Sequence, residues 1–98
     1  MNIRKRKIKF PSEVKNKCNR YLSRKTLEIT YFDGYMIDFT NTNFSTLSPH
    51  KILLKSKEKE LIILYYGDYY CKGELYFIND TKNPCSFQKL RQLVGNYF

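Results

Sequence analysis

Basic side chains that could bind phosphate groups are concentrated in the first quarter of the chain. Residues 1–25 hold ten of them and a single acid, Glu13, so this segment accounts for the whole net charge of +9. Residues 26–98 hold equal numbers of bases and acids. Lysine and arginine form charge-assisted hydrogen bonds with phosphate oxygens, and a cluster of them on one segment is typical of nucleic-acid-binding proteins. The residues predicted to bind nucleic acid are Arg4, Lys5, Arg6, Lys7, Lys9, Lys15, Lys17, Arg20, Arg24 and Lys25.

The same charges would attract other anionic partners, or would serve solubility alone. We expect a small basic module that contacts the phosphates of RNA or DNA through an N-terminal arm and the first helix. The alternative is a protein-binding inhibitor or adaptor of the phage or mobile-element type, which would dock on a nucleic-acid-handling enzyme or an acidic surface. No base-reading side chain can be identified, so we expect weak sequence preference. The oligomeric state is left open.

Catalytic and metal-binding residues are not indicated by the sequence. His50 is the only histidine, has no Cys, Ser or Asp at a recognisable motif spacing, and is expected in a loop. Cys18, Cys71 and Cys85 are odd in number and form no CxxC pair, so they predict neither a disulfide framework nor a zinc site. They fit a reducing, cytoplasmic location. We therefore predict no catalytic residue, metal or cofactor, and a protein that is not an enzyme.

Tyrosines form a second possible contact surface for nucleic acid. Five of them fall within a short stretch, and exposed rings could stack on bases. In a small β domain such rings more commonly pack in the core and across strands, and we favour packing here. They are Tyr65, Tyr66, Tyr69, Tyr70 and Tyr76.

The phosphate-binding residues would be positioned by an arm and a helix. The four consecutive bases Arg4–Lys7 repel one another, which favours a disordered arm over residues 1–10, rather than a short edge strand, until a polyanion binds. Ser12 is a candidate helix cap. An apolar stripe then recurs with helical spacing and leaves most of the nearby bases outward. It consists of Val14, Cys18, Tyr21 and Leu22.

A hairpin is predicted at LEITYFDGYMIDFT, residues 27–40. A three-residue loop over 32–34 would put the alternating apolar residues of both strands on one face, with Gly34 in the left-handed conformation. This register also places Glu28 opposite Asp38. Two facing carboxylates could hold a divalent cation, but two solvated carboxylates are the favoured interpretation.

The remaining chain predicts further strands and a last helix. KILLKS and ELIILYY read as strands joined by a charged turn, with Leu61–Tyr66 apolar on both faces as in a central strand. Two continuations are compatible with the sequence: the chain turns at residues 67–68, or the strand continues to a turn at 72–73. In both cases GELYFI is predicted to be the last strand. Ser86 would cap a helix with Phe87, Leu90, Leu93, Val94 and Tyr97 on its apolar face.

These elements predict an α+β fold. Its parts are an N-terminal helix, about five antiparallel strands forming a curved sheet or small barrel, and a C-terminal helix. The chain divides into a basic arm, 1–10, and a single domain, 11–98. The N-terminus lacks the apolar run of a signal peptide, and the longest apolar run is too short to span a bilayer.

Two family resemblances accompany this pattern. The order of helix, bent Asp-Gly hairpin, KILLKS and LIILYY is similar to the Sm/Hfq small barrel over about residues 12–66, which implies RNA binding; that family's Lys-His pair is replaced here by Tyr66-Gly67-Asp68. KEKELIILYYGDYY resembles the closing strands of RelE-type ribonuclease toxins, whose second N-terminal helix has no counterpart here. This resemblance implies a second alternative, a small ribonuclease that uses bases and tyrosines without histidine. We assign the chain to neither family.

Overall fold

The fold is α+β, as predicted from the sequence, but seven strands of the described residues form two sheets instead of about five in one, and the first strand precedes the first helix. The computed structural model describes residues 3–23, 26–40, 44–67, 74–79 and 82–98. Their strands form two antiparallel sheets, with the orders β1-β3-β4 and β2-β5-β6-β7, and neither sheet closes into a barrel. The elements in chain order are β1 (Ile3–Ile8), α1 (Ser12–Leu22), β2 (Glu28–Phe32), β3 (Gly34–Phe39), β4 (Ser45–Ser48), β5 (His50–Lys55), β6 (Glu60–Tyr66), β7 (Leu75–Ile78) and α2 (Phe87–Tyr97).

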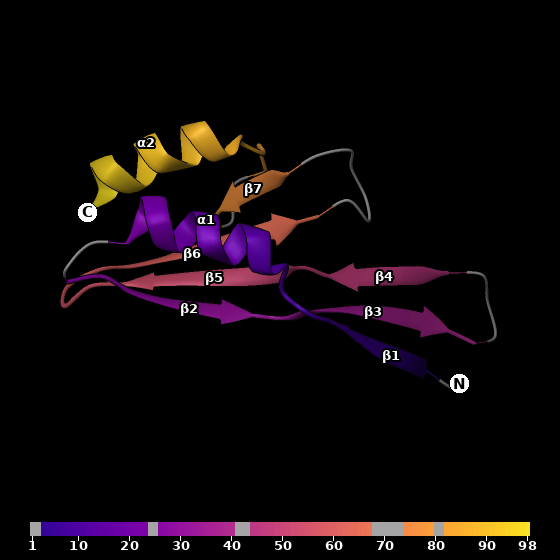
Figure 1. Ribbon diagram of the computed structural model, residues 1–98. Helices are drawn as coiled ribbons and strands as arrows, with labels where there is room; N and C mark the ends of the chain where they lie inside the picture. Colours follow the sequence, from indigo (N-terminus) through magenta and orange to yellow (C-terminus); the bar gives the residue numbers. More distant parts are fainter. Residues whose placement is uncertain (1–2, 24–25, 41–43, 68–73, 80–81) are drawn as a thin grey trace.

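A long two-stranded ladder connects the two sheets. Glu28 pairs with Lys55 at one end and Asp38 with Ser45 at the other, and every pair between them keeps the same offset. The strands are interrupted at Asp33 on one side of the ladder and at Pro49 on the other. Proline has no N–H that could donate a hydrogen bond to the facing strand. Segments 28–39 and 45–55 therefore form one hairpin that leaves the four-stranded sheet and continues into the three-stranded sheet. Figure 1 shows it along the length of a molecule measuring 48 × 24 × 24 Å.

The predicted Asp-Gly hairpin is wrong. Tyr31 pairs with Ile52, whereas Tyr35 pairs with Ser48 and Lys7, so β2 and β3 are successive parts of one hairpin arm. The φ angle of Gly34 lies outside the left-handed region. The physical reason for the error is that alternation of apolar residues specifies which face of a strand is buried, but not which strand lies beside it.

The predicted facing of Glu28 and Asp38 is wrong for the same reason. Glu28 lies in the four-stranded sheet opposite Lys55. Asp38 lies in the three-stranded sheet opposite Arg4 and forms an ion pair with Arg6. The two carboxylates therefore cannot share a cation.

Both helices cover the same face of the four-stranded sheet, as Figure 1 shows. Alternate residues of β5 and β6 point into this layer, and Tyr65 and Tyr76 are among the buried side chains. Packing is thus confirmed for these two tyrosines, while Tyr69 and Tyr70 lie outside the described residues. Burial of such side chains is the main favourable contribution to folding. The core contains Phe10, Val14, Cys18, Leu22, Ile52, Leu54, Leu61, Ile63, Tyr65, Tyr76, Leu90 and Val94.

Of the two predicted helix caps, the structure shows the cap of α2 but not that of α1. Ser86 caps α2 as predicted, because its hydroxyl accepts a hydrogen bond from the Lys89 N–H at 3.2 Å. Ser12 is the first residue of α1 rather than its cap, and Pro11 takes the cap position. Tyr21, predicted on the apolar stripe of this helix, is exposed and lies under the Arg91 guanidinium, 4.3 Å from its ring centroid.

Residues 3–8, expected in a disordered arm, form the edge strand β1 beside β3. Successive side chains of a strand point to opposite faces, which separates neighbouring cations in space and weakens the repulsion that favoured disorder. The three-stranded sheet has no helix against it in Figure 1. Among its described residues only Gly34 is buried, so this sheet extends beyond the core.

The backbone contact at Gly34 predicts a strong response to substitution. A Cβ at this position would lie 2.7 Å from the Ser48 carbonyl oxygen, and backbone cannot swing away as a side chain can. We expect Gly34→Ala to lower the free energy of unfolding by about 1–3 kcal/mol, the usual cost of overpacking. Urea denaturation measures this change. Gly67→Ala is the control, because its Cβ would meet ordinary contacts from 3.4 Å outward. Equal stability of the two variants would contradict the contact.

Candidate nucleic-acid interface

Eight of the ten predicted phosphate-binding residues lie on β1, on α1 and on the short junction between them. Figure 1 shows the two elements following one another along the molecule. The junction is held by Phe10, whose ring is buried and whose N–H donates a hydrogen bond to Asp33 Oδ1 at 2.7 Å. The carboxylate of Asp33 also pairs with Lys7 Nζ at 3.2 Å. The orientation of the basic strand relative to the basic helix is therefore fixed by the hairpin.

The cations of β1 are divided between the two faces of the sheet. Lys5 shares a face with Tyr35, and its Nζ lies 4.2 Å from the centroid of that ring. Arg6, on the other face, has its Nε 3.6 Å from Asp38 Oδ2. Both members of this pair are substantially exposed, so water and salt screen it and it contributes little to stability. The arginine can therefore exchange this carboxylate for a phosphate at small cost.

Lysines on α1 have two different roles. Lys15 is exposed and its Nζ lies 5.3 Å from the ring centroid of Tyr31. Lys17 is partly buried, forms an ion pair with Glu74 and lies 4.4 Å from the ring centroid of Phe87. Lys17 therefore connects α1 to the C-terminal half of the protein, and its charge is already neutralised.

The ten predicted residues thus fall into three groups. Arg24 and Lys25 lie outside the described residues. Arg6, Lys7 and Lys17 have carboxylate partners. The other five are exposed and, within the described part of the chain, have no carboxylate oxygen within 4.0 Å: Arg4, Lys5, Lys9, Lys15 and Arg20.

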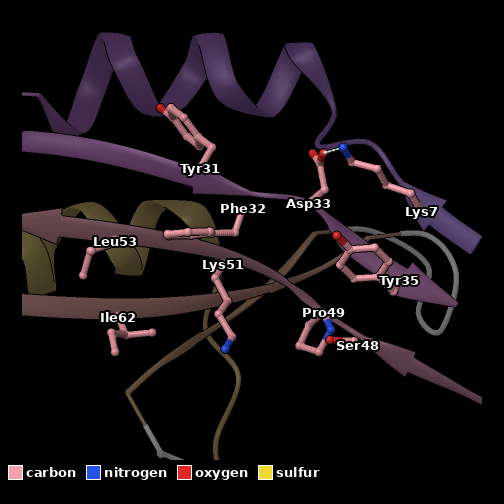
Figure 2. Close-up of a pocket in the computed structure, with 10 residues that line it drawn as sticks. All are labelled: Lys7, Tyr31, Phe32, Asp33, Tyr35, Ser48, Pro49, Lys51, Leu53 and Ile62. Atoms are coloured by element: carbon pink, nitrogen blue, oxygen red, sulfur yellow. Dashed lines mark ion pairs between the residues drawn. The ribbon is translucent and has the colours of Figure 1, made fainter. Parts of the chain in front are cut away.

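A groove that the sequence does not predict lies beside β1. It has a volume of about 620 Å³ and is lined by residues that include Lys7, Phe32, Tyr35, Lys51 and Ile62. Figure 2 shows Phe32, Lys51 and Ile62 on the sheet face turned away from α1, with Lys7 at one end of the groove. Phe32 is 46% exposed and Ile62 is 44% exposed. The sequence feature that could have indicated the groove is the apolar run Leu61–Tyr66. This segment forms a central strand, as predicted, but the helices cover only one of its two apolar faces.

His50 is a buried strand residue, so its expected position in a loop is wrong. The residue is 6% exposed, and its ring packs against those of Phe10 and Tyr65. Its Nδ1 accepts a hydrogen bond from the Gly34 N–H at 2.9 Å. Burial lowers the pKa of His50, an effect partly opposed by the negative charge of Asp33. The imidazole is therefore neutral at pH 7 and acts as a structural acceptor.

The described ranges can also be compared with what a metal site, a reactive thiol and a membrane span require. They contain no group of three or more His, Cys, Asp or Glu side chains that could hold a metal ion. Burial raises the pKa of the Cys18 thiol to about 12, which leaves this core cysteine protonated and unreactive. Nor do the same ranges contain a helix long and apolar enough to cross a membrane. The arrangement is suited to binding anions through exposed cations.

Comparison with known proteins adds no further assignment. The chain matches no family model, no curated protein and no solved structure.

The lowered pKa of His50 predicts acid sensitivity. The unfolded chain takes up a proton at histidine near its ordinary pKa of about 6.5, whereas the folded chain resists protonation until lower pH. The contribution of His50 is thus fully present above pH 6.5 and is lost as the pH falls from 6.5 toward the folded pKa. We expect His50→Gln, which keeps an acceptor without titrating, to reduce the decline in stability between pH 7 and pH 5 in urea denaturation.

A direct control uses the single histidine of the sequence. Its ring protons give one NMR titration curve that reports the folded pKa without any substitution. A midpoint at or above 6.5, or an equally steep decline in stability for wild type and His50→Gln, would contradict the prediction.

Proposed function

We propose that the protein is a small nucleic-acid-binding module that holds the phosphates of RNA or DNA along β1 and α1, and that it acts by binding rather than by catalysis. The observation that carries this proposal is the set of five exposed cations without a carboxylate partner in the described residues, all within 4–20. Cations that are not neutralised by the protein's own acids are the ones that release counterions from a polyanion.

The dimensions of the basic surface fit several phosphates at once. The six residues of β1 span about 20 Å and the eleven residues of α1 about 16 Å at the usual rises of strand and helix. A DNA duplex carries one charge per roughly 1.7 Å of axis, so phosphates are available to each of the five cations.

The edge position of β1 adds neutral donors to this surface. Among the strands that the structure describes, β1 has a neighbour on one side only, so alternate backbone N–H groups point away from β3. Backbone N–H groups are common donors to phosphate oxygens and fix orientation without reading sequence. This supports backbone binding with weak sequence preference. An acidic protein surface is the competing partner, and the following experiment distinguishes the two.

Salt dependence tests the proposal. With about five phosphates neutralised, log K should fall against log salt concentration with a slope of about −3.5 for single strands or −4.5 for duplex. Replacing Arg4, Lys9 and Lys15 together by Gln should reduce this slope by about 2–3. We choose these residues because they are exposed and outside the ion pairs, unlike Lys17. Fluorescence anisotropy with labelled RNA and DNA measures the slopes.

A matched variant removes the same charge elsewhere. Lys57, Lys82 and Lys89 are also exposed, and their replacement by Gln should change the slope much less. Equal slopes for the two triple variants would show that only net charge matters. A folded wild-type protein that binds no nucleic acid at low salt, but captures a protein in a nuclease-resistant complex, would replace the proposal with the adaptor alternative.

A further inference from the structure

We propose that the groove beside β1 binds unpaired nucleobases, so that the ligand of the module is a single strand of RNA or DNA. This inference rests on the proposed function and adds the class of nucleic acid. It uses the opposite face of the four-stranded sheet from the one that packs on the helices. The same face is crossed by Phe32, Lys51, Leu53 and Ile62, which lie on three neighbouring strands.

The groove offers flat apolar surface of the kind that bases stack on. Phe32, at the end of β2, is nearly half exposed, and Tyr35 lines the same groove from β3. Leu53 and Ile62 provide an aliphatic floor. Stacking of a base on an aromatic ring tolerates any base, because every base has a π-face. Bases inside a duplex are already stacked on each other and cannot enter.

Cations connect the groove to the basic strand. Lys7 belongs to β1, pairs in register with Tyr35, and lines the groove. Lys5 lies on the same face of β1 with its Nζ near the Tyr35 ring. A backbone that follows β1 therefore passes the mouth of the groove, where its bases can turn inward. The phosphates and the bases of one strand thus have adjacent binding surfaces.

Charge within the groove also favours a phosphate-bearing ligand. Lys51, which pairs in register with Phe32, is exposed and has no carboxylate oxygen within 4.0 Å in the described part of the chain. The one acid that lines the groove, Asp33, is occupied by the Phe10 N–H and by Lys7. The groove therefore has a free cation beside its aromatic surface, while its carboxylate is already neutralised.

Substitution of Phe32 tests the inference. The probes are a 5′-labelled 12-nucleotide oligo-U RNA, an oligo-dT of the same length, and their duplexes with complementary strands, followed by fluorescence anisotropy. Phe32→Ser should weaken single-strand binding about 5- to 150-fold, the range for loss of one stacked base. The loss should be the same at every salt concentration, because no charge is removed. Wild type should bind single strands more tightly than duplexes.

Two further variants separate stacking from apolar contact. Phe32→Tyr keeps a ring and should bind like wild type. Phe32→Leu keeps apolar bulk without a π-face and should lose most of the affinity that Phe32→Ser loses. Phe44→Ser is the matched control, since Phe44 is 74% exposed and does not line the groove. Circular dichroism and the urea midpoint establish that each variant is folded.

The outcomes distinguish this inference from the proposed function. If wild type binds nucleic acid with the expected salt slope, but Phe32→Ser or Phe32→Leu binds like wild type, the groove inference fails and the phosphate surface stands. Equal affinity of wild type for single strands and duplexes would likewise overturn the groove inference and leave the phosphate surface in place. If wild type binds neither, the proposed function fails as well.

A measurement on the unmodified protein is independent of folding defects. Photocross-linking with 4-thiouridine in the oligo-U probe, followed by mass spectrometry, should label the peptide that contains Phe32 and Tyr35. Adducts confined to other peptides would overturn the inference.

Discussion

The pairing of residues 28–39 with 45–55 in one constant register, on both sides of a short break, is the interaction on which the rest of the structure depends. One half of this ladder supplies Ile52 and Leu54 to the core beneath the helices. The other half supplies the edge to which β1 adds. A slip of one residue would turn the inward side chains of β5 outward and away from the core.

The break in the middle of this ladder is repaired by side chains. Pro49 has no N–H to donate across the ladder, and the N–H of Gly34 donates its hydrogen bond to the His50 imidazole. Nearby, the carboxylate of Asp33 accepts from the Phe10 N–H, which attaches the junction between β1 and α1 to the same point. Two polar side chains thus determine how the basic segment is oriented. Neither belongs to the set of residues that the charge pattern singles out.

Local signals predicted the parts of the fold that depend on neighbours in the chain. The β5–β6 hairpin, the Ser86 cap and the inward stripe of α1 at Val14, Cys18 and Leu22 follow from spacing and turn chemistry. The partner of β2 did not follow, because alternation carries no information about distant strands. The pairing of Lys17 with a carboxylate 57 residues away, and the uncovered face that forms the groove, depend on the same long-range arrangement.

The three-stranded sheet has a consequence for the dynamics of the protein. Its strands are held mainly by backbone hydrogen bonds, with hardly a buried side chain among the described residues of β1, β3 and β4. Such a unit opens at a lower free energy than the core, so its amide hydrogens exchange through local fluctuations that leave the helices intact. Any ligand that binds only the closed sheet shifts this opening equilibrium by mass action. A ligand bound to the basic strand would therefore raise the free energy of opening of this sheet and slow the exchange of the amide hydrogens that β1 bonds to β3.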